Sequence, residues 1–396
     1  MSGCKIVLKR NKEESLQRFH PWVFSGAIAS IDGSPEEGDL IEVYSAGNQF
    51  LGIGHYQIGS IAVRILSFQP TLVDKAFWKE KISVAFKLRC ALGLAGVNNN
   101  NTCRLIHGEG DQLPGLVIDI YGQTAVIQAH SVGMHRARIS IADALKEVLG
   151  DALQHIYYKS ETTLPFKADI DNENEYLLGG DIGNTHIALE KGLQFYVDWL
   201  KGQKTGFFID QRDNRLLLEQ YARKRLVLNM FCFTGSFSVY ALRGGAALVH
   251  SVDSSARAIS LATRNVELNF PNDSRHQAFA EDAFDFLAKM GDRYDLIILD
   301  PPAFAKHKNV VRNALQGYRK LNAIAIEKIK PGGIIFTFSC SQVISKNDFR
   351  LAVFSAAAQT GRHVRILHQL TQPADHPVNI YHPEGEYLKG LVLEVE

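Results

Sequence analysis

Two strand-like stretches of the chain each end in a residue that can act on a planar ring. The run YDLIILDPPAF ends with Asp300, and Pro301 and Pro302 would stop the strand and hold the carboxylate rigidly. The run IIFTFSCS ends with Cys340. If these strands are neighbours, Asp300 and Cys340 face one cleft, where an acid can hold an amine-bearing base against Phe304 and a thiol can attack it. A capping aspartate and a small buried cysteine are the structural alternatives.

Three other positions follow one another in an order that suits an adenosine-containing cofactor. Gly235 lies in a turn of VLNMFCFTGSFSVYAL, where its backbone could approach a ligand. Asp253, at the end of LVHSVD, could accept the protons of both ribose hydroxyls, and Asp282 in FAEDAF could hold an adenine amino group. The turn has one glycine and lacks the G-x-G-x-x-G pattern, which disfavours NAD. The set therefore predicts S-adenosylmethionine as the cofactor, with an ordinary turn at Gly235 and a helix cap at Asp253 as the alternatives.

These residues need a parallel sheet to bring them together. From about residue 205, four short apolar runs alternate with helical segments: RLVLNMF, AALVHSVD, YDLIILD and GGIIFTFSC. Apolar strands that alternate with helices predict a parallel sheet covered on both faces. In such a Rossmann-like α/β fold, ligands bind at the carboxyl ends of the strands.

The first half of the chain contains two segments with different sequence patterns. Residues 1–72 are strand-like and rich in turns, which indicates a small, mostly β module. Residues 73–190 mix a helical pattern near 74–92 with strand patterns, which indicates an α+β domain that ends near a hairpin-like run at 186–199. The remaining residues, 191–396, form the predicted Rossmann-like domain.

Composition limits the classes of protein that fit. A length of 396 residues is too long for one ordinary domain, and a net charge of +1 gives no global argument for a nucleic-acid partner. No apolar run is long enough for a membrane span, and the start of the chain lacks the apolar core of a signal peptide. The cysteines are scattered and never spaced as C-x-x-C, so we expect no metal site, no membrane partner and a reducing, cytoplasmic location. They are Cys4, Cys90, Cys103, Cys232 and Cys340.

Local charge points to RNA more than the overall charge does. Residues 301–330 carry seven basic side chains against the single acidic Glu327, at the rim of the proposed cleft. A solvated helix face is the alternative to phosphate contacts. Near the N-terminus, His20, Trp22 and Phe24 alternate as on a strand with one ring-bearing face, which is either an RNA platform or core. The RNA-binding candidates are Trp22, Phe304, Lys306, Lys308 and Arg312.

Several motifs together resemble the RlmI-type bacterial methyltransferases, which make 5-methylcytosine in large-subunit (23S) ribosomal RNA. The matching runs are NMFCFTGSF, SVDSS, DPPAF, SCS, ADHPV and EGEYLKG, preceded by KTGFFIDQRDNR. The run RFHPWVFSGAI is similar to the opening of the family's PUA domain, a small RNA-binding β module. The resemblance covers essentially the whole chain. It implies a PUA domain, a central α+β domain and a Rossmann-like, S-adenosylmethionine-dependent methyltransferase domain.

The resemblance also implies a role for individual residues. Cys340 would be the nucleophile that adds to carbon 6 of the cytosine, and Asp300 would be its partner on the base. Phe231, Thr234 and Gly235 would line the methionine end of the cofactor, while Gln211 and Arg212 would close the pocket. The implied cofactor-binding set is Gln211, Arg212, Phe231, Thr234, Gly235, Asp253, Ser254, Asp282, Ala283 and Asp300.

Two other functions remain open at this point. An RNA guanine methyltransferase could use the Asp-Pro-Pro motif for orientation without a nucleophile, although Cys340 favours cytosine. A non-catalytic RNA-binding factor for ribosome assembly could retain the same fold. The base that removes the proton from carbon 5 is also open, since DPPAF contains no second cysteine; Asp375 and His376 are candidates, with a structural role as the alternative. The target nucleotide and the oligomeric state, including a homodimer, are not determined by the sequence.

Overall fold

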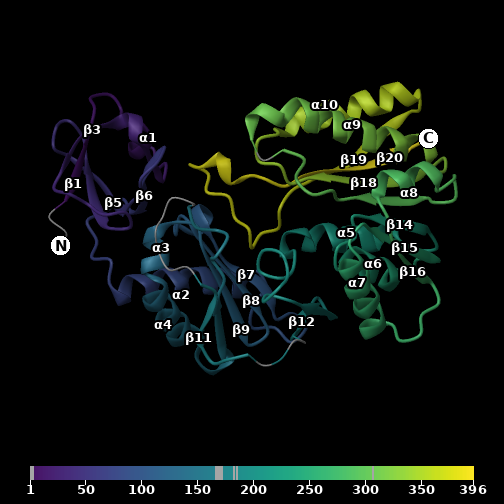
Figure 1. Cartoon of the computed structure of the whole chain (residues 1–396), viewed down its shortest axis with the longest axis horizontal. Coiled ribbons are helices and arrows are strands. Elements are labelled where there is room, and N and C mark those ends of the chain that lie inside the picture. Colours follow the sequence, from purple (N-terminus) through teal and green to yellow (C-terminus); the bar gives the residue numbers. More distant parts are fainter. Residues whose placement is uncertain (1–3, 166–172, 182, 184–185, 306) are drawn as a thin grey trace. The chain divides into compact units, whose positions relative to one another are not determined.

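The computed structural model describes residues 4–165, 173–181, 183, 186–305 and 307–396. The chain forms two compact units that are discontinuous in sequence (Figure 1). The first unit comprises the described part of Met1–Lys191 together with Val197–Ile209 and Ala374–Gly385, and the second comprises Gly192–Tyr196, Asp210–Pro373 and Glu386–Glu396. The division into three domains at residues 72 and 190 stays a prediction.

The N-terminal part of the first unit is a six-stranded sheet in the order β2-β6-β5-β4-β1-β3. Side chains alternate between core and surface along β1 and β4, so that Ile6, Leu8, Ile41 and Val43 are fully buried. This arrangement confirms the expected small β module. The elements are β1 (Lys5–Leu8), α1 (Glu14–Gln17), β2 (Trp22–Phe24), η1 (Ser25–Ala27), β3 (Ile28–Asp32), β4 (Leu40–Tyr44), β5 (Phe50–Tyr56) and β6 (Ile61–Ser67).

The central part of the first unit is a five-stranded sheet in the order β11-β10-β9-β8-β7, with helices packed against it. Helix α2 begins at Asp74, whose side chain accepts a hydrogen bond from the backbone N–H of Phe77 at 3.1 Å. Its buried residues pack against α4 and the sheet. The elements are α2 (Lys75–Ala91), β7 (Thr102–His107), η2 (Gly108–Asp111), β8 (Leu116–Tyr121), β9 (Thr124–Ala129), α3 (Val132–Arg136), α4 (Arg138–Leu149), η3 (Gly150–Ala152), β10 (His155–Tyr158) and β11 (Glu175–Leu178).

The hairpin expected at 186–199 is present as the two-stranded sheet of β12 (His186–Glu190) and β13 (Leu193–Val197). Its turn residues Lys191 and Gly192 have φ angles of 49° and 84°. Two positive φ angles are the signature of a type I′ turn, whose twist matches that of paired strands. The chain passes from the first unit to the second between these two residues.

The second unit is built on a seven-stranded sheet in the order β16-β15-β14-β17-β18-β20-β19. Strands β14 to β18 pair in parallel, and β20 is antiparallel to both of its neighbours. The strands are β14 (Leu226–Met230), β15 (Leu248–Asp253), β16 (His276–Ala280), β17 (Leu296–Leu299), β18 (Gly333–Ser339), β19 (Val364–Leu370) and β20 (Lys389–Val395). The strand order reverses between β14 and β17, and the carboxyl ends beside such a reversal are where doubly wound folds bind ligands.

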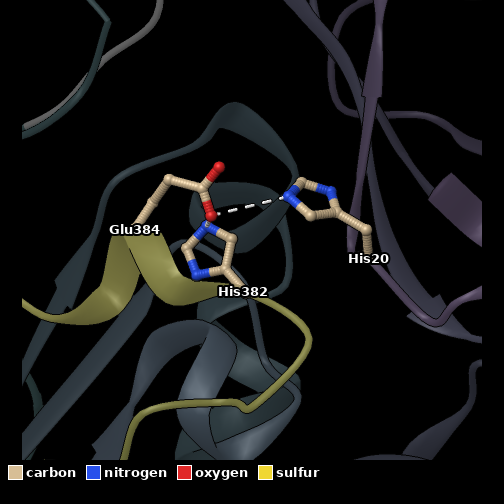
Figure 2. A group of neighbouring side chains, drawn as sticks. All are labelled: His20, His382 and Glu384. Atoms are coloured by element: carbon tan, nitrogen blue, oxygen red, sulfur yellow. Dashed lines mark ion pairs between the residues drawn. The ribbon is translucent and has the colours of Figure 1, made fainter.

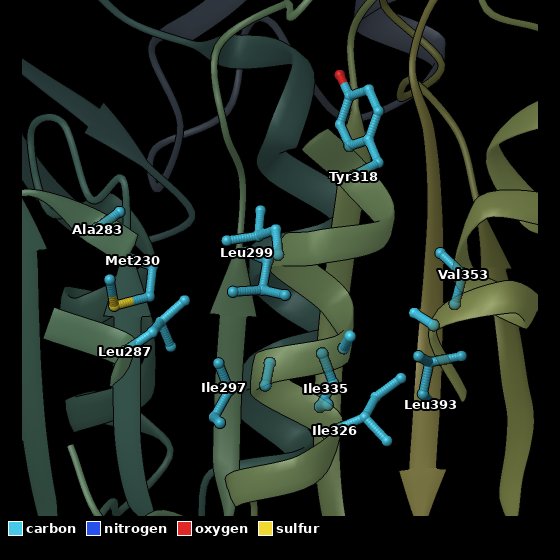
Figure 3. Close-up of a cluster of buried hydrophobic side chains, with 14 of the residues drawn as sticks. Met230, Ala283, Leu287, Ile297, Leu299, Tyr318, Ile326, Ile335, Val353 and Leu393 are labelled. Atoms are coloured by element: carbon cyan, nitrogen blue, oxygen red, sulfur yellow. The ribbon is translucent and has the colours of Figure 1, made fainter. Parts of the chain in front are cut away.

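Helices cover both faces of this sheet, with α5, α6 and α7 on one side and α8, α9 and α10 on the other (Figure 1). Figure 3 shows apolar side chains of the sheet, such as Leu299 and Ile335, packed against Leu287, Ile326 and Val353 of the helices. The expected Rossmann-like fold is therefore confirmed. The helices are α5 (Arg212–Tyr221), α6 (Ser236–Arg243), α7 (Ala256–Asn269), α8 (Ala283–Lys289), α9 (Val311–Lys328) and α10 (Lys346–Thr360), with the short η4 (Ile209–Gln211), η5 (Lys308–Val310) and η6 (Pro383–Gly385). No helix in the described ranges is long and apolar enough to cross a membrane.

Candidate active site

The loop that follows β14 has an unusual backbone. Phe231, Phe233 and Gly235 have φ angles of 56°, 45° and 73°, in the left-handed region that residues other than glycine rarely adopt. At Gly235 there is also no room for a side chain, because a Cβ atom there would lie 2.7 Å from the Cβ of Ala262 on α7. The sequence predicted a turn whose backbone could approach a ligand; the structure shows the turn, and the close approach seen at Gly235 is to helix α7.

A buried amide and a carboxylate hold this loop in place. Asn265 of α7 donates from Nδ2 to the carbonyl oxygen of Thr234 at 2.8 Å. Asp253, at the end of β15, accepts the backbone N–H of Phe233 at 3.0 Å on Oδ2 and that of Ser255 at 2.9 Å on Oδ1. Each carboxylate oxygen can accept a second hydrogen bond, so Asp253 can hold the loop and still receive ribose hydroxyls. This donor and acceptor set fits an adenosine cofactor.

Asp282 has a structural role that the sequence analysis did not consider for it. It is the N-cap of α8, where its Oδ1 accepts the N–H groups of Phe284 at 2.8 Å and Asp285 at 3.2 Å. Its Oδ2 makes no hydrogen bond within the described part of the chain and faces no competing partner there. The neighbouring Ala283 is buried, whereas Ser254 after β15 is exposed. The adenine-binding role of Asp282 stays a prediction.

Asp300 lies directly after β17 and is linked to the segment that was expected to close the pocket. Gln211 donates from Nε2 to Oδ2 of Asp300 at 3.1 Å. Asn214 in turn donates from Nδ2 to Oε1 of Gln211 at 2.6 Å, which orients the Gln211 amide. Arg212 is fully buried at the start of α5. The carboxylate of Asp300 is thus held by a chain of two amides that originates on α5.

Cys340 lies one residue beyond β18 and is half-buried. Strand β18 pairs in parallel with β17, with Leu299 opposite Thr337, so the expected neighbouring strands are confirmed. The hydroxyl of the buried Ser341 accepts the N–H of Ala305 at 3.4 Å and lies 3.3 Å from the hydroxyl of Tyr318. This contact connects the cysteine turn to the loop that follows Asp300. Asp300 and Cys340 therefore sit at the carboxyl ends of two adjacent strands whose loops are tied together.

Lys389 was not identified from the sequence as a functional residue. It is the first residue of β20, its side chain is 5% exposed, and it lies opposite Ser339 in the pairing of β20 with β18. Its Nζ donates to the carbonyl oxygens of Ser341 at 2.6 Å and Ile344 at 2.8 Å. Burial lowers the pKa of Lys389 to about 8. The signal in the sequence is a lysine at the start of the mostly apolar run KGLVLEV, since lysine is seldom buried without a partner.

A second cysteine lies near the proposed cofactor but is unsuited to attack. Cys232 is buried in the loop after β14, with its Sγ 3.8 Å from the carbonyl oxygen of Phe233. Burial, with a smaller contribution from the charge of Asp253, raises the pKa of the Cys232 thiol. A thiol that resists ionisation is a poor nucleophile. The half-buried Cys340 stays the predicted nucleophile.

Comparison with known proteins identifies the family. Residues 156–385 match the S-adenosylmethionine-dependent methyltransferase family, and residues 6–68 match the PUA-like domain. The chain belongs to this methyltransferase family. Its cofactor is S-adenosylmethionine, as the order of Gly235, Asp253 and Asp282 predicted.

Full-length relatives and solved structures agree with this assignment. The methyltransferase is 40% identical over 402 residues to the ribosomal RNA large subunit methyltransferase I of Pseudoalteromonas atlantica, covering 99% of this chain and 100% of the relative. The protein of the same name in Klebsiella pneumoniae is 37% identical over 400 residues, with 99% and 98% covered. A Streptococcus mutans structure provisionally assigned to the SAM-dependent methyltransferases has the same fold, with a TM-score of 0.84, 23% identity, and 99% and 100% of the two chains covered.

The basic segment after Asp300 divides into paired and unpaired cations. Arg319 donates from Nη2 to Oε1 of Gln359 at 3.0 Å, and Lys328 donates to the carbonyl oxygen of Ala288 at 2.6 Å. Lys308 in η5 and Arg312 at the start of α9 are exposed, and neither has a hydrogen bond or ion pair within the described residues. These two side chains are available for phosphate. Lys306 lies outside the described residues, and the ring of Phe304 packs 4.7 Å from that of Tyr318.

In the first unit, the ring-bearing face of β2 contacts residues far away in the sequence. Trp22 donates from Nε1 to Oε1 of Glu109 at 2.8 Å, and its ring lies 4.3 Å from that of His382. Figure 2 shows His20 facing Glu384, with Nε2 to Oε2 at 3.6 Å. Trp22 thus has structural contacts, and its RNA-binding role stays a prediction.

His20, His382 and Glu384 also have the composition of a metal site, since their ligand atoms lie within 4.8 Å of one another. However, Nδ1 of His20 accepts the backbone N–H of Trp22 at 3.2 Å, which leaves the ring proton of a neutral imidazole on Nε2. In this tautomer Nε2 has no lone pair to offer to a metal. Its distance of 3.6 Å from Oε2 of Glu384 is longer than a hydrogen bond, so the imidazole and the carboxylate make only a loose contact.

Asp375 and His376 pack within the first unit, whereas Cys340 belongs to the second. Oδ2 of Asp375 accepts the backbone N–H of Arg104 at 3.0 Å, and the carbonyl oxygen of Asp375 accepts from Nη2 of Arg89 at 2.9 Å. Both Asp375 and His376 are fully buried. These contacts support the structural alternative for the ADHP run, and the base of the release step stays unassigned.

Proposed function

We propose that this methyltransferase modifies carbon 5 of a cytosine in large-subunit ribosomal RNA, with Cys340 as a covalent nucleophile. The observation that carries the proposal is a half-buried cysteine at the end of β18, beside the strand that ends in Asp300. The choice of RNA rests on the relatives, which are named for large-subunit ribosomal RNA, and on the PUA-like match at residues 6–68.

The need for a thiolate follows from the reactivity of the base. Carbon 5 of cytosine is too weak a nucleophile to attack a methyl group directly. A thiolate that adds to carbon 6 forms the S–C6 bond and moves the π electron pair onto carbon 5 and the ring, so that carbon 5 becomes enamine-like. S-adenosylmethionine, when bound, supplies the electrophilic methyl group. Loss of the proton from carbon 5 then restores the double bond and expels the thiolate of Cys340.

Asp300 is suited to hold the base during this sequence. Its carboxylate can accept a hydrogen bond from the exocyclic amine or a protonated ring nitrogen, which stabilises the adduct. The amide chain from Asn214 through Gln211 orients the carboxylate, and each carboxylate oxygen can accept more than one hydrogen bond. A stacked cytosine could not reach these groups, so the target is unpaired or flipped out of its helix.

Replacement of the nucleophile tests the proposal. Cys340→Ala should reduce methyl transfer to background while S-adenosylmethionine binding is retained, because nothing else activates carbon 5. Cys90→Ala is the matched control, since Cys90 is exposed on α2 in the other unit. RNA with 5-fluorocytosine at the target should trap the wild-type protein covalently, because fluorine cannot leave as a proton. The adduct should survive a denaturing gel and map to Cys340 by mass spectrometry.

The same experiment addresses the rival chemistry. A guanine methyltransferase would use Asp300 to orient a ring or exocyclic nitrogen that already has a lone pair, and it would need no cysteine. A fully active Cys340→Ala variant, together with a methylated guanine in the product, would overturn the cytosine proposal in favour of that reaction.

A further inference from the structure

We propose that the ammonium group of Lys389 stabilises the Cys340 thiolate and positions the turn that carries it. This role deepens the proposed function and rests on Cys340 being its nucleophile. Lys389 is a positioning residue because it acts through the cysteine and is not assigned a contact with substrate.

The first support is the register of the sheet. Strand β20 pairs antiparallel with β18, and Lys389 lies opposite Ser339, the last residue of β18. The lysine therefore begins its strand at the level where the neighbouring strand ends and the cysteine follows. No other basic residue of β20 shares this position, since Glu394 is the only other charged residue among Lys389–Val395.

The second support is the way the turn wraps around the ammonium group. Nζ donates to the carbonyl oxygens of Ser341 and Ile344, at 2.6 and 2.8 Å, and both lie on the C-terminal side of Cys340. An ammonium has three N–H donors, so these carbonyls leave one donor available. With its carbonyls drawn toward Nζ, the turn is held close to a buried positive charge.

The third support is the charge environment. Burial lowers the pKa of Lys389 to about 8, while negative charge on Cys340 and on Glu386 opposes this and Lys346 reinforces it. Glu386 and Lys346 form an ion pair at 2.5 Å, which reduces the net effect of both. Tyr318 also faces the cysteine, and burial raises the pKa of its hydroxyl, which keeps it neutral.

A physical consequence follows from reciprocity. If negative charge on Cys340 favours the ammonium form of Lys389, the ammonium must favour the thiolate form of Cys340 by the same free energy. Below the lysine's pKa of about 8, the thiol can lose its proton to solvent while the lysine keeps its own. The same cation would stabilise the thiolate when it is expelled from the methylated base.

Alkylation of Cys340 measures this effect in the full chain without RNA. The rate of reaction with iodoacetamide, followed by peptide mass spectrometry across a range of pH, reports the fraction of thiolate. In Lys389→Met the midpoint of this profile should move to higher pH by about 1 to 3 units, the usual effect of losing a nearby opposite charge. Lys389→Arg should retain most of the wild-type midpoint, because it keeps the charge.

A second variant is the control for Lys389→Met, and a purely structural role of Lys389 would give a different result from the one expected. Arg350→Met removes an exposed cation from helix α10, one that is not among the charges acting on Lys389, and should leave the midpoint unchanged. A purely structural role for Lys389 would alter the plateau rate or the unfolding temperature of Lys389→Met but not its midpoint, and that result would overturn the inference.

If the Lys389 variants do not fold, the same interaction can be measured from the other side, by replacing Cys340 and following the pKa of Lys389. In Cys340→Ala the pKa of Lys389, measured by the pH dependence of amine acylation at that residue, should fall below its wild-type value. An unchanged value would contradict the pairing. The two proposals can be contradicted independently. If Cys340→Ala still methylates RNA, the covalent mechanism is wrong. If the midpoint of the alkylation profile is the same in Lys389→Met and the wild type, only the role of Lys389 is wrong.

Discussion

Asp253 has a structural role that is compatible with the ligand-binding role predicted for it. Its two oxygens fix the loop after β14 and the turn after β15 through backbone N–H groups, and both keep lone pairs for a ligand. The proposed roles of Cys340 and Lys389 also depend on local structure, because the turn that carries the thiol provides the two carbonyl oxygens that bind the ammonium group. Single residues at strand ends therefore connect the fold to the chemistry.

Replacement of Asp253 should weaken the cofactor more than the fold. We expect Asp253→Ala to reduce the affinity for S-adenosylmethionine by about 1.5–3 kcal/mol, the range for lost hydrogen bonds to a charged group. Titration calorimetry measures this, with Asp292→Ala at an exposed position as the control. Unchanged affinity in Asp253→Ala, or comparable binding of NAD to the wild type, would contradict the assignment of the ribose site.

A histidine in the first unit should make stability depend on pH. Burial lowers the pKa of His55 from 6.5 to about 4. Between pH 6.5 and about pH 4, His55 is therefore protonated in the unfolded chain but neutral in the folded chain. Its contribution to the free energy of unfolding should fall by up to about 1.4 kcal/mol per pH unit as the pH is lowered through this window. His55→Gln should flatten the slope of urea-unfolding stability against pH, whereas exposed His363→Gln should not. Identical slopes for His55→Gln and the wild type would show that His55 is not the group that titrates.

At the scale of elements, apolar runs predicted β14, β15, β17 and β18 and hence the chemistry at their ends. Strand β19 was not identified, because VRILHQL is largely exposed and resembles a surface loop in sequence. Its neighbour β20 completes the sheet by antiparallel pairing, which only the folded sheet specifies. Lys389 was missed for this reason: its partners are carbonyl groups of a turn about 45 residues earlier, and no local pattern encodes them.

Helix α9 offers a test of the RNA surface. The double reversal Lys308→Glu and Arg312→Glu should weaken RNA binding and make it less dependent on salt, by about 0.7 in the logarithmic slope for each lost contact with single-stranded RNA. Arg319→Glu on the same helix is the control, because that guanidinium is already bonded to Gln359. Filter binding at several salt concentrations measures both. An unaltered slope in the double variant would mean that this end of α9 is only solvated.

At the scale of the whole molecule, the two units are not two consecutive halves of the chain. Residues 374–385 return to the first unit after most of the second has been completed, and Asp375 bonds there to Arg89 and Arg104. The sequence pattern predicted a domain boundary near residue 190. It did not predict that residues 374–385 pack in the first unit, because contacts between such distant positions leave no periodic signal in the sequence. The predicted cofactor residues all belong to the second unit.

Because the predicted cofactor residues all belong to the second unit, we expect the cofactor to stabilise that unit. At about 100 times its dissociation constant, a ligand adds about 2.7 kcal/mol to the stability of the state that binds it, which slows hydrogen exchange through openings that abolish binding by about 100-fold. We expect amides of β14, β15 and the loop around Phe233 to gain this protection with S-adenosylmethionine, and amides of β8 and β9 in the first unit to exchange unchanged. Asp253→Ala should lose most of the gain at the same cofactor concentration, because it removes the carboxylate assigned to the ribose. Hydrogen exchange followed by mass spectrometry resolves both units in one experiment. Equal protection in β8 and β14 would contradict the expectation, since it would mean that the units open together and that the cofactor stabilises the chain as one body.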